Sequence, residues 1–365
     1  MLKKRIVALI AAVAIVCFSS VAAVAETGEY KCAVILYSDD SYFEPDADID
    51  SFGYAEIAAY KARLAEEGYD VMLTDAGGLT VPDTDYDAQI VDIMNETGYD
   101  VVIPGEHDFD CGTEQFFGLV ENADFSLLSC NFSCIDGDKK QPALVPAAYI
   151  EIAGHSVGLI GVCTPRTMVN AGDGTFTDEN GEYIYDFCSE NDGQELYDRV
   201  QMIIDTVDSQ YSPDYFVVLA HLGTDDVSAP WSSYQLISNT VGIDVVVDGN
   251  SQTAIDGETV KNRAGEGVIL TSCGAESKYI GAVKIDENGI NTELIPVDSY
   301  SVTDDTATDE YKTYMRVREY IVGTEPENSS DKASPDTGAD GVSIAFASAL
   351  VAMMVLLVCK RKGAA

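Results

Sequence analysis

Five short apolar runs, each followed by a loop rich in Gly, Asp, Ser or His, constrain the fold of this chain more than any other feature. They cover residues 32–37, 71–74, 101–103, 215–220 and 244–247. Short apolar runs bounded by turn residues are typical of strands buried inside a sheet. Segments with apolar residues at helical spacing lie between them, as at 54–67 and 194–209. This alternation predicts an α/β fold whose polar loops collect at the carboxyl ends of the strands.

The first 25 residues are predicted to form a signal peptide. Basic residues at 3–5 precede an apolar run at 6–18, and Ala-Val-Ala at 23–25 supplies the small residues of a cleavage site. This order is typical of a secretory leader that is removed from the mature protein. An uncleaved membrane anchor is the alternative, and the small-residue site favours cleavage.

The C-terminal segment, residues 334–365, is predicted to anchor the protein. Ser-Pro-Asp-Thr-Gly at 334–338 precedes an apolar run at 342–359 and three basic residues. This order resembles the sortase signal of Gram-positive surface proteins, with a serine where that signal usually has leucine. The resemblance implies cleavage between Thr337 and Gly338 and covalent attachment to peptidoglycan. A plain transmembrane tail is the alternative, since the run is about long enough to cross a bilayer. Both place the protein at the outer cell surface.

Residues 29–300 are predicted to form one folded domain, in which 166–192 is an inserted irregular loop rich in Gly, Asp, Asn and Tyr. Residues 301–333 are predicted to form an acidic, polar spacer that contains only a short helix at 311–320. The net charge of −41 excludes nucleic acid as a partner, because like charges repel. The oligomeric state is left open.

Most of the nine cysteines are predicted to be buried hydrophobic residues. Two lie in the terminal segments, which leaves an odd number for the domain, and most of those seven stand in apolar runs. As an alternative, Cys130 and Cys134 could form a disulfide. No matching histidine or second cysteine pair accompanies them, which argues against a zinc site.

Gly-Glu-His-Asp-Phe-Asp-Cys-Gly at 105–112 is the candidate catalytic loop. It follows the strand predicted at 101–103 and carries three carboxylates and one of only three histidines in the chain. A loop of this kind at the end of a buried strand is where α/β enzymes place reactive groups. A solvated polar turn is the alternative when the loop is considered by itself.

The order of the five loops resembles that of the calcineurin-like metallophosphoesterases, specifically the N-terminal catalytic domain of secreted 5′-nucleotidases. Matching phrases include Leu-Ser-Cys-Asn at 128–131, Gly-Val-Cys-Thr-Pro at 161–165 and Tyr-Ile-Gly at 279–281. The resemblance implies a four-layer αββα sandwich, in which two mixed sheets are flanked by helices. It also implies hydrolysis of phosphomonoesters or nucleotides at a centre of two divalent metals.

The resemblance assigns roles to residues of the loops. His107 and Asp110 match the family's transition-state dyad and are the candidate catalytic residues. Of the residues at the family's seven metal-ligand positions, four are the candidate metal ligands of this chain: Asp40, Glu106, His221 and Asn250. Only Asp40 and His221 keep the residue type that the family has there.

The metal-ligand positions depart from the family pattern at five places. These are Tyr42, Gly78, Glu106, Asn250 and Gln252. Gly78 replaces the carboxylate that bridges two metals, and tyrosine, asparagine and glutamine replace imidazoles. A two-metal mechanism holds its cations about 3.5–4 Å apart, and imidazole is the ligand that suits transition metals. We therefore expect no metal, or one hard cation such as Ca²⁺ or Mg²⁺ held by Asp40 and Glu106 with water.

Two functions are consistent with this pattern. By resemblance, the chain is a surface hydrolase of phosphoric esters that takes a small phosphorylated ligand, with activity that is weak or lost. The alternative is a non-catalytic, wall-anchored binding module that uses the same fold, and the number of lost ligands favours it. Without cations, the carboxylates of the loops repel phosphate.

Overall fold

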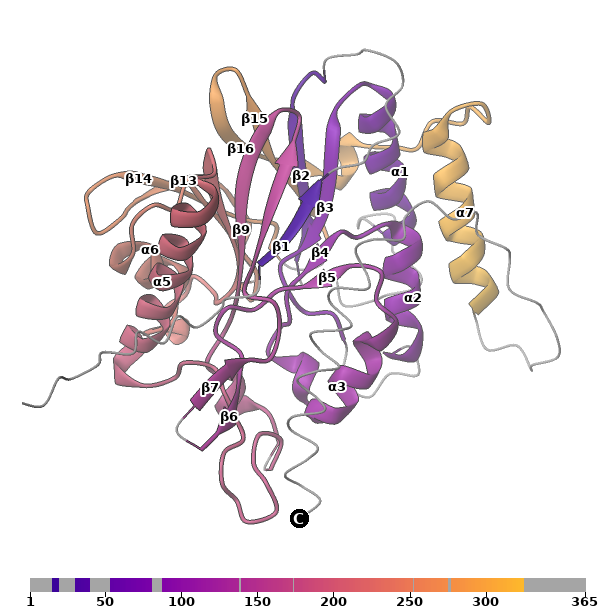
Figure 1. Ribbon diagram of the computed structural model, residues 1–365. Helices are drawn as coiled ribbons and strands as arrows, with labels where there is room; N and C mark the ends of the chain where they lie inside the picture. Colours follow the sequence, from indigo (N-terminus) through magenta and orange to yellow (C-terminus); the bar gives the residue numbers. More distant parts are fainter. Residues whose placement is uncertain are drawn as a thin grey trace, which may run out of the picture.

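The computed structural model describes residues 15–19, 30–39, 53–80, 87–137, 139–172, 174–251, 253–274 and 277–324. Two large sheets lie between helices that cover their outer sides (Figure 1). Both sheets contain parallel and antiparallel strand pairs. These four layers confirm the predicted α/β sandwich of two mixed sheets flanked by helices.

The six-stranded sheet carries the first three predicted strands. Its spatial order is β16 (Gly289–Pro296), β15 (Tyr279–Asp286), β2 (Ala33–Ser38), β3 (Asp70–Asp75), β4 (Val101–Val102) and β5 (Ser126–Leu127). The strands from β2 to β5 are parallel, and β15 is antiparallel to β2 and β16. Parallel strands have their carboxyl ends at one edge, so the loops that follow β2, β3 and β4 are neighbours there.

The seven-stranded sheet carries the other two predicted strands. Its spatial order is β1 (Ile15–Ser19), β8 (Ala147–Ile152), β9 (His155–Cys163), β11 (Tyr215–His221), β12 (Val245–Asp248), β14 (Gly267–Ser272) and β13 (Ile255–Lys261). The strands β9, β11, β12 and β14 are parallel, whereas β8 and β13 are antiparallel to their inner neighbours. The loops after β11 and β12 therefore also share one edge.

The remaining elements cover or extend these sheets. A small sheet has the order β10 (Tyr185–Asp186), β6 (Ser133–Asp136) and β7 (Lys139–Pro142). The helices are α1 (Tyr54–Glu66), α2 (Asp87–Thr97), α3 (Thr113–Leu119), α4 (Thr167–Asn170), α5 (Gln194–Tyr211), α6 (Ser233–Asn239) and α7 (Asp309–Thr324). Short 3₁₀ turns are η1 (His107–Phe109), η2 (Val120–Asn122), η3 (Asn191–Gly193), η4 (Asp226–Ser228) and η5 (Val297–Ser299).

Strand β2 shows why the buried runs are apolar at every position. Ala33, Ile35 and Tyr37 lie in the core between the two sheets, whereas Val34 and Leu36 pack with residues of α1 and α2 on the outer side. Side chains alternate between the faces of a strand, and this strand is covered on both faces. It therefore lacks the alternation of apolar and polar residues that a half-exposed strand would show.

Helix α5 confirms the prediction of a helix at 194–209. Its buried side chains, which recur at intervals of three or four residues, are Leu196, Tyr197, Val200, Ile203, Ile204 and Val207. They pack against the outer face of the seven-stranded sheet together with residues of β9 and β11. An apolar stripe at this spacing is what attaches a helix to a sheet.

Helix α7 corrects the prediction that residues 301–333 form a spacer. It contains the short helix predicted at 311–320 and lies against α1 and α2 (Figure 1). Val317 is fully buried in that contact, Arg316 pairs with Glu96 of α2, and the backbone N–H of Asp309 donates to Glu66 Oε1 at 2.7 Å. The folded domain therefore extends to residue 324. The helix is mostly polar in composition, which is why its sequence suggests a spacer.

Most predictions about the chain ends fall outside the described residues. These include the leader cleavage site, Thr337 and Gly338 of the sortase signal, and the apolar run at 342–359. Five residues of the predicted leader, Ile15–Ser19, form β1 at the edge of a sheet, parallel to β8. Among the described residues, no helix has the length and apolar content needed to span a bilayer.

The seven cysteines of the described domain, from Cys32 to Cys273, form no disulfide. Five are buried, Cys32 is partly buried and Cys111 is exposed, so most are buried hydrophobic residues as predicted. The alternative of a disulfide between Cys130 and Cys134 is wrong. The two side chains belong to different cores, on the outer faces of different sheets.

Candidate functional site

The candidate site lies where loops from both sheets meet at the carboxyl ends of their strands. His221, at the end of β11, lies beside Gly77 after β3, Gly105 after β4 and Gly249 after β12. Of the predicted site residues, the structure places His221 in this group, and Glu106, His107 and Asp110 in a second group at the candidate catalytic loop. Asp40 lies outside the described residues, as do Tyr42 and Gln252.

His221 is packed against backbone on several sides. It is 2% exposed, and its Nδ1 lies 2.9 Å from the Ala76 carbonyl oxygen, to which it donates a hydrogen bond. A Cβ atom on Gly77 would lie 2.3 Å from Nδ1, on Gly249 2.9 Å from Nδ1, and on Gly105 3.1 Å from Nε2. Contacts this short are rarely or never tolerated, so glycine at these positions is what allows the loops to close around the imidazole.

Asn250 directly follows this group. Its backbone has a φ of 67°, in the left-handed region where asparagine is among the favoured residues, and the residue is partly buried. The next residue, Ser251, accepts a hydrogen bond at Oγ from the backbone N–H of Thr224 at 2.6 Å. The loops after β11 and β12 are thus joined beside His221.

Asp108 fixes the candidate catalytic loop against the loop after β3. Its carboxylate is buried and accepts hydrogen bonds from the backbone N–H groups of Gly105 and Thr80, both at 2.7 Å, and from Thr80 Oγ1 at 3.0 Å. Burial raises the pKa of Asp108, and these hydrogen bonds, with the charge of His221, oppose the shift. Asp108 is not among the residues that the sequence singles out. Its only signal is its place between His107 and Asp110 in the same loop.

Phe109 fixes the same loop to the hydrophobic core. Its side chain is fully buried, and its ring centroid lies 4.6 Å from that of Phe116, 5.2 Å from Phe132 and 5.4 Å from Phe187. Aromatic pairs at such separations add stability beyond the area that they bury. With Phe109 and Asp108 facing inward, η1 turns the side chains of His107 and Asp110 toward the surface.

His107 stands between two carboxylates. Its Nδ1 lies 2.9 Å from Asp110 Oδ2, and its Nε2 lies 3.6 Å from Glu106 Oε1. Burial lowers the pKa of His107, but the hydrogen bond and charge of Asp110, with the charges of Glu106 and Asp108, outweigh it and raise the pKa. The side chain is 43% exposed, so this imidazole can reach a ligand from solvent. It can hold a proton and deliver it there.

Glu106 is fixed by a residue that the sequence does not single out. Asn170 Nδ2, at the end of α4, donates to Glu106 Oε2 at 2.9 Å. Asn170 lies in the segment 166–192, for which the sequence predicts an irregular loop. Because the two residues are 64 positions apart, no local pattern of residues could indicate their contact.

Three further buried carboxylates at the ends of strands shape the loops of the site. Asp75 accepts from Ser38 Oγ at 2.6 Å and from the backbone N–H of Gly77 at 2.9 Å. Asp248 accepts from the backbone N–H of Gly223 at 3.1 Å, and Asp39 accepts from Ser272 Oγ at 3.2 Å. Each of these aspartates ends or directly follows a strand, and that position is the signal that could have identified them.

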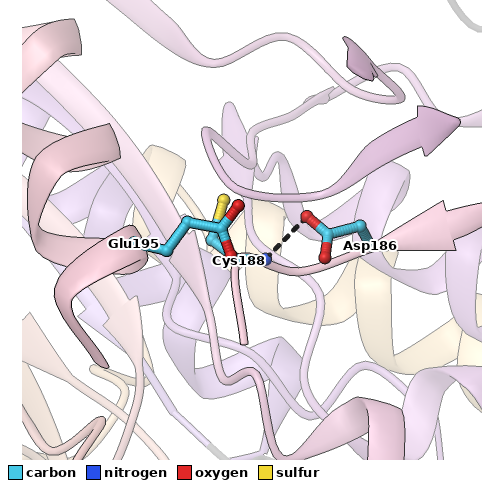
Figure 2. A group of neighbouring side chains, drawn as sticks. All are labelled: Asp186, Cys188 and Glu195. Carbon is cyan, nitrogen blue, oxygen red and sulfur yellow. Dashed lines mark hydrogen bonds between the residues drawn. The ribbon is translucent and has the colours of Figure 1, made fainter. Parts of the chain in front are cut away.

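Apart from the candidate site, three residues of types that can bind a metal lie close together elsewhere in the domain. Figure 2 shows Asp186, Cys188 and Glu195, whose potential ligand atoms lie within 4.8 Å of one another. Lys140 Nζ donates to Asp186 Oδ2 at 2.9 Å and to Glu195 Oε1 at 2.6 Å. Burial raises the pKa of Cys188 to about 12, so its thiol is protonated at neutral pH. These residues could hold a cation by type, but the Lys140 ammonium already pairs with both carboxylates.

The fold and the position of the site define the class of protein that this chain resembles. The mixed α/β fold is like that of the calcineurin-like phosphoesterases and of the N-terminal domain of 5′-nucleotidases. The 5′-nucleotidase precursor from Thermus thermophilus superimposes with a TM-score of 0.59 and 19% identity, covering 80% of this chain and 59% of that one.

Curated relatives belong to the same group of proteins. The mouse (Mus musculus) 5′-nucleotidase is 26% identical over 227 residues, which are 59% of this chain and 35% of that protein. The trifunctional nucleotide phosphoesterase protein YfkN of Bacillus subtilis is 20% identical over 268 residues, covering 63% of this chain and 17% of that protein. The chain thus spans less than half the length of these relatives. No protein-family model matches it.

Proposed function

We propose that this chain is a cell-surface protein of the phosphoesterase fold in which hydrolysis of phosphomonoesters or nucleotides is weak or lost. Its distant homologues are 5′-nucleotidases and nucleotide phosphoesterases, which supports a relationship to proteins of this fold. The observation that carries the proposal is the place of Gly78: its backbone lies against Gly105, beside His221, and it has no side chain there to bridge two cations.

A dinuclear metal centre does not fit the described residues of this site. Such a centre needs ligands that hold two cations a few ångströms apart, usually through a bridging carboxylate. Gly78 has no side chain to supply the bridge. His221 already donates its Nδ1 hydrogen to the carbonyl oxygen of Ala76. Among the described residues, His221 is the one imidazole ligand of the family pattern that is kept, and one of its two nitrogens is already in a hydrogen bond.

The candidate dyad is better preserved than the ligand set. His107 and Asp110 keep the contact that lets a histidine hold and transfer a proton. General acid–base catalysis of this kind typically contributes about 10²–10⁴-fold in rate, far less than the full acceleration of phosphate-monoester hydrolysis. A site that keeps only these groups would bind a ligand more effectively than it would hydrolyse a phosphate ester. This favours the non-catalytic binding module as the second candidate function.

The proposed location is the outer surface, with attachment to peptidoglycan. The leader at 1–25, the motif ending in Thr337 and Gly338, and the apolar run at 342–359 support this placement. Covalent attachment would keep the candidate site within reach of extracellular ligands.

Turnover of 5′-AMP and p-nitrophenyl phosphate by the processed chain, residues 26–337, tests the proposal. It is measured with Mn²⁺, Zn²⁺, Ca²⁺ or Mg²⁺, together with the metal content of the protein. The Thermus thermophilus 5′-nucleotidase serves as a positive control. We expect a rate at least about 10³-fold below that control, because metal stabilisation of the transition state is worth several kcal/mol. Two bound transition metals, with turnover that His107→Ala abolishes, would contradict the proposal.

A further inference from the structure

We propose that Glu106 sets the ligand specificity of this site by excluding oxyanions from His107. The ligand class of the site is then neutral or cationic rather than phosphate-bearing. This inference rests on the proposed function, because a phosphate-hydrolysing site would have to admit the oxyanion that Glu106 repels.

The first support is the position of the Glu106 carboxylate. His107 presents two ring nitrogens, and Asp110 Oδ2 already takes Nδ1 at 2.9 Å. The remaining nitrogen, Nε2, is the one that a ligand would approach, and Glu106 Oε1 lies 3.6 Å from it. A phosphate oxygen that bonded to Nε2 would therefore lie beside a carboxylate of the same charge.

The second support is that Glu106 is held in place. Its side chain is only 14% exposed, and Asn170 Nδ2 donates to its Oε2 at 2.9 Å. Asn170 ends α4, whose first residue Thr167 is buried and donates through Oγ1 to the Thr164 carbonyl at 2.7 Å. Arg166, directly before α4, donates to the Val227 carbonyl and ties this segment to η4. The Glu106 carboxylate is thus held by a segment, residues 166–170, that is itself fixed by hydrogen bonds to the rest of the domain.

The third support is the charge balance around His107. The imidazole can offer one positive charge, whereas Glu106 and Asp110 contact it with two negative charges. The net charge of this group is negative, so it repels an approaching oxyanion but does not repel a neutral or cationic ligand. At a separation of about 4 Å, repulsion by one carboxylate lowers anion affinity at least about five-fold even at the dielectric constant of water.

Binding of inorganic phosphate to the processed chain in EDTA tests this inference. The chain has only three histidines, so the ring signals of His107 can be followed by NMR during the titration. Glu106→Gln keeps the shape of the side chain and removes its charge. We expect it to bind phosphate at least about five-fold more tightly than the wild type. Glu106→Asn serves as a second neutral variant in case the first folds poorly.

Two controls separate local repulsion from other effects. Glu121→Gln removes one charge at an exposed position of η2 and should leave the affinity unchanged, which tests for a general effect of net charge. Asn170→Ala keeps the Glu106 charge but removes its hydrogen bond, and should give a smaller gain than Glu106→Gln. Equal phosphate affinity in Glu106→Gln and the wild type, or no binding by either neutral variant, would overturn the inference.

The result is independent of the test of the proposed function. Because EDTA removes metals, hydrolysis by a metal-loaded wild type would overturn the proposed function without altering this comparison. Conversely, the wild type could be inactive as proposed while Glu106→Gln shows no gain in phosphate affinity, which would overturn only the specificity assigned to Glu106.

Discussion

Replacement of His221 by alanine should destabilise the protein even when no metal is available. His221 is a buried side chain whose Nδ1 donates to the Ala76 carbonyl at 2.9 Å, within walls formed by Gly77, Gly105 and Gly249. If its role were only to bind a metal, truncation in EDTA would change the free energy of unfolding little. The substitution therefore distinguishes a structural residue from a metal ligand.

The expected loss has two parts. A buried carbonyl that loses its hydrogen bond costs about 1–3 kcal/mol. Removing the ring leaves a cavity of about 60 Å³, and at about 24 cal/mol per Å³ this adds about 1.5 kcal/mol. The glycine walls of His221 have no side chains that could relax into the space, so little of the cavity term is recovered. We expect a total loss of about 3–4 kcal/mol.

Urea unfolding in EDTA, followed by the fluorescence of the single tryptophan, Trp231, measures this loss. His155→Ala is the matched control, because His155 is partly exposed at the start of β9 and should cost less than about 1 kcal/mol. His221→Asn retains an N–H donor and should recover part of the loss. A loss below about 1 kcal/mol for His221→Ala in EDTA, or one seen only with metal present, would refute the reasoning.

Three further predictions concern the loops and the C-terminal helix. Gly105→Ala places a Cβ 2.5 Å from the backbone nitrogen of Gly78, so it should lower the free energy of unfolding by about 1–3 kcal/mol in the same assay. Asp110→Asn should lower the pKa of His107 in an NMR titration, because the hydrogen bond and charge of Asp110 help to raise it. The stabilisation from that raised pKa is present below the unfolded value of about 6.5 and is lost as pH rises through the folded-state pKa. Val317→Ala should lower the free energy of unfolding by about 1–2 kcal/mol and loosen α7, which hydrogen exchange of that helix would reveal.

The layers of this fold can be predicted from the sequence because buried strands consist almost entirely of apolar residues. Strands such as β2 and β11 are covered on both faces, so every residue from Val34 to Leu36 or from Phe216 to Ala220 is apolar. Loops at the ends of parallel strands must meet at one edge, which is why the position of the candidate site could also be predicted. Both the layers of the fold and the position of the candidate site can therefore be inferred from residue types alone.

The inner geometry of the site is not predictable in the same way. Which carboxylate of the candidate catalytic loop faces inward depends on the 3₁₀ turn η1, which buries Asp108 and turns Asp110 outward. The contact from Asn170 to Glu106 depends on the path of an irregular segment. The packing around His221 depends on three glycines in three different loops, and glycine by itself does not indicate what will approach it.

The packing of helix α7 against the domain escapes prediction for a related reason. Its contact with α1 and α2 relies on a few apolar and aromatic side chains and on polar links such as that between Arg316 and Glu96 of α2. Its buried carboxylate, Glu310, accepts from Tyr300 at 2.8 Å and from Thr303. A helix held by such pairs has the composition of a solvated segment, and only the tertiary contacts show that it is packed.

The place of α7 in the chain has a mechanical consequence. A protein attached to the wall through Thr337 would receive any pull on that attachment at residue 324, where α7 ends. Tension would reach the contact of α7 with α1 and α2 before it reached β15 or β16, which precede α7 in the chain. Val317 and the pair of Arg316 with Glu96 would bear this load first. The two sheets, and the loops that they position, would keep their geometry until α7 had separated from α1 and α2.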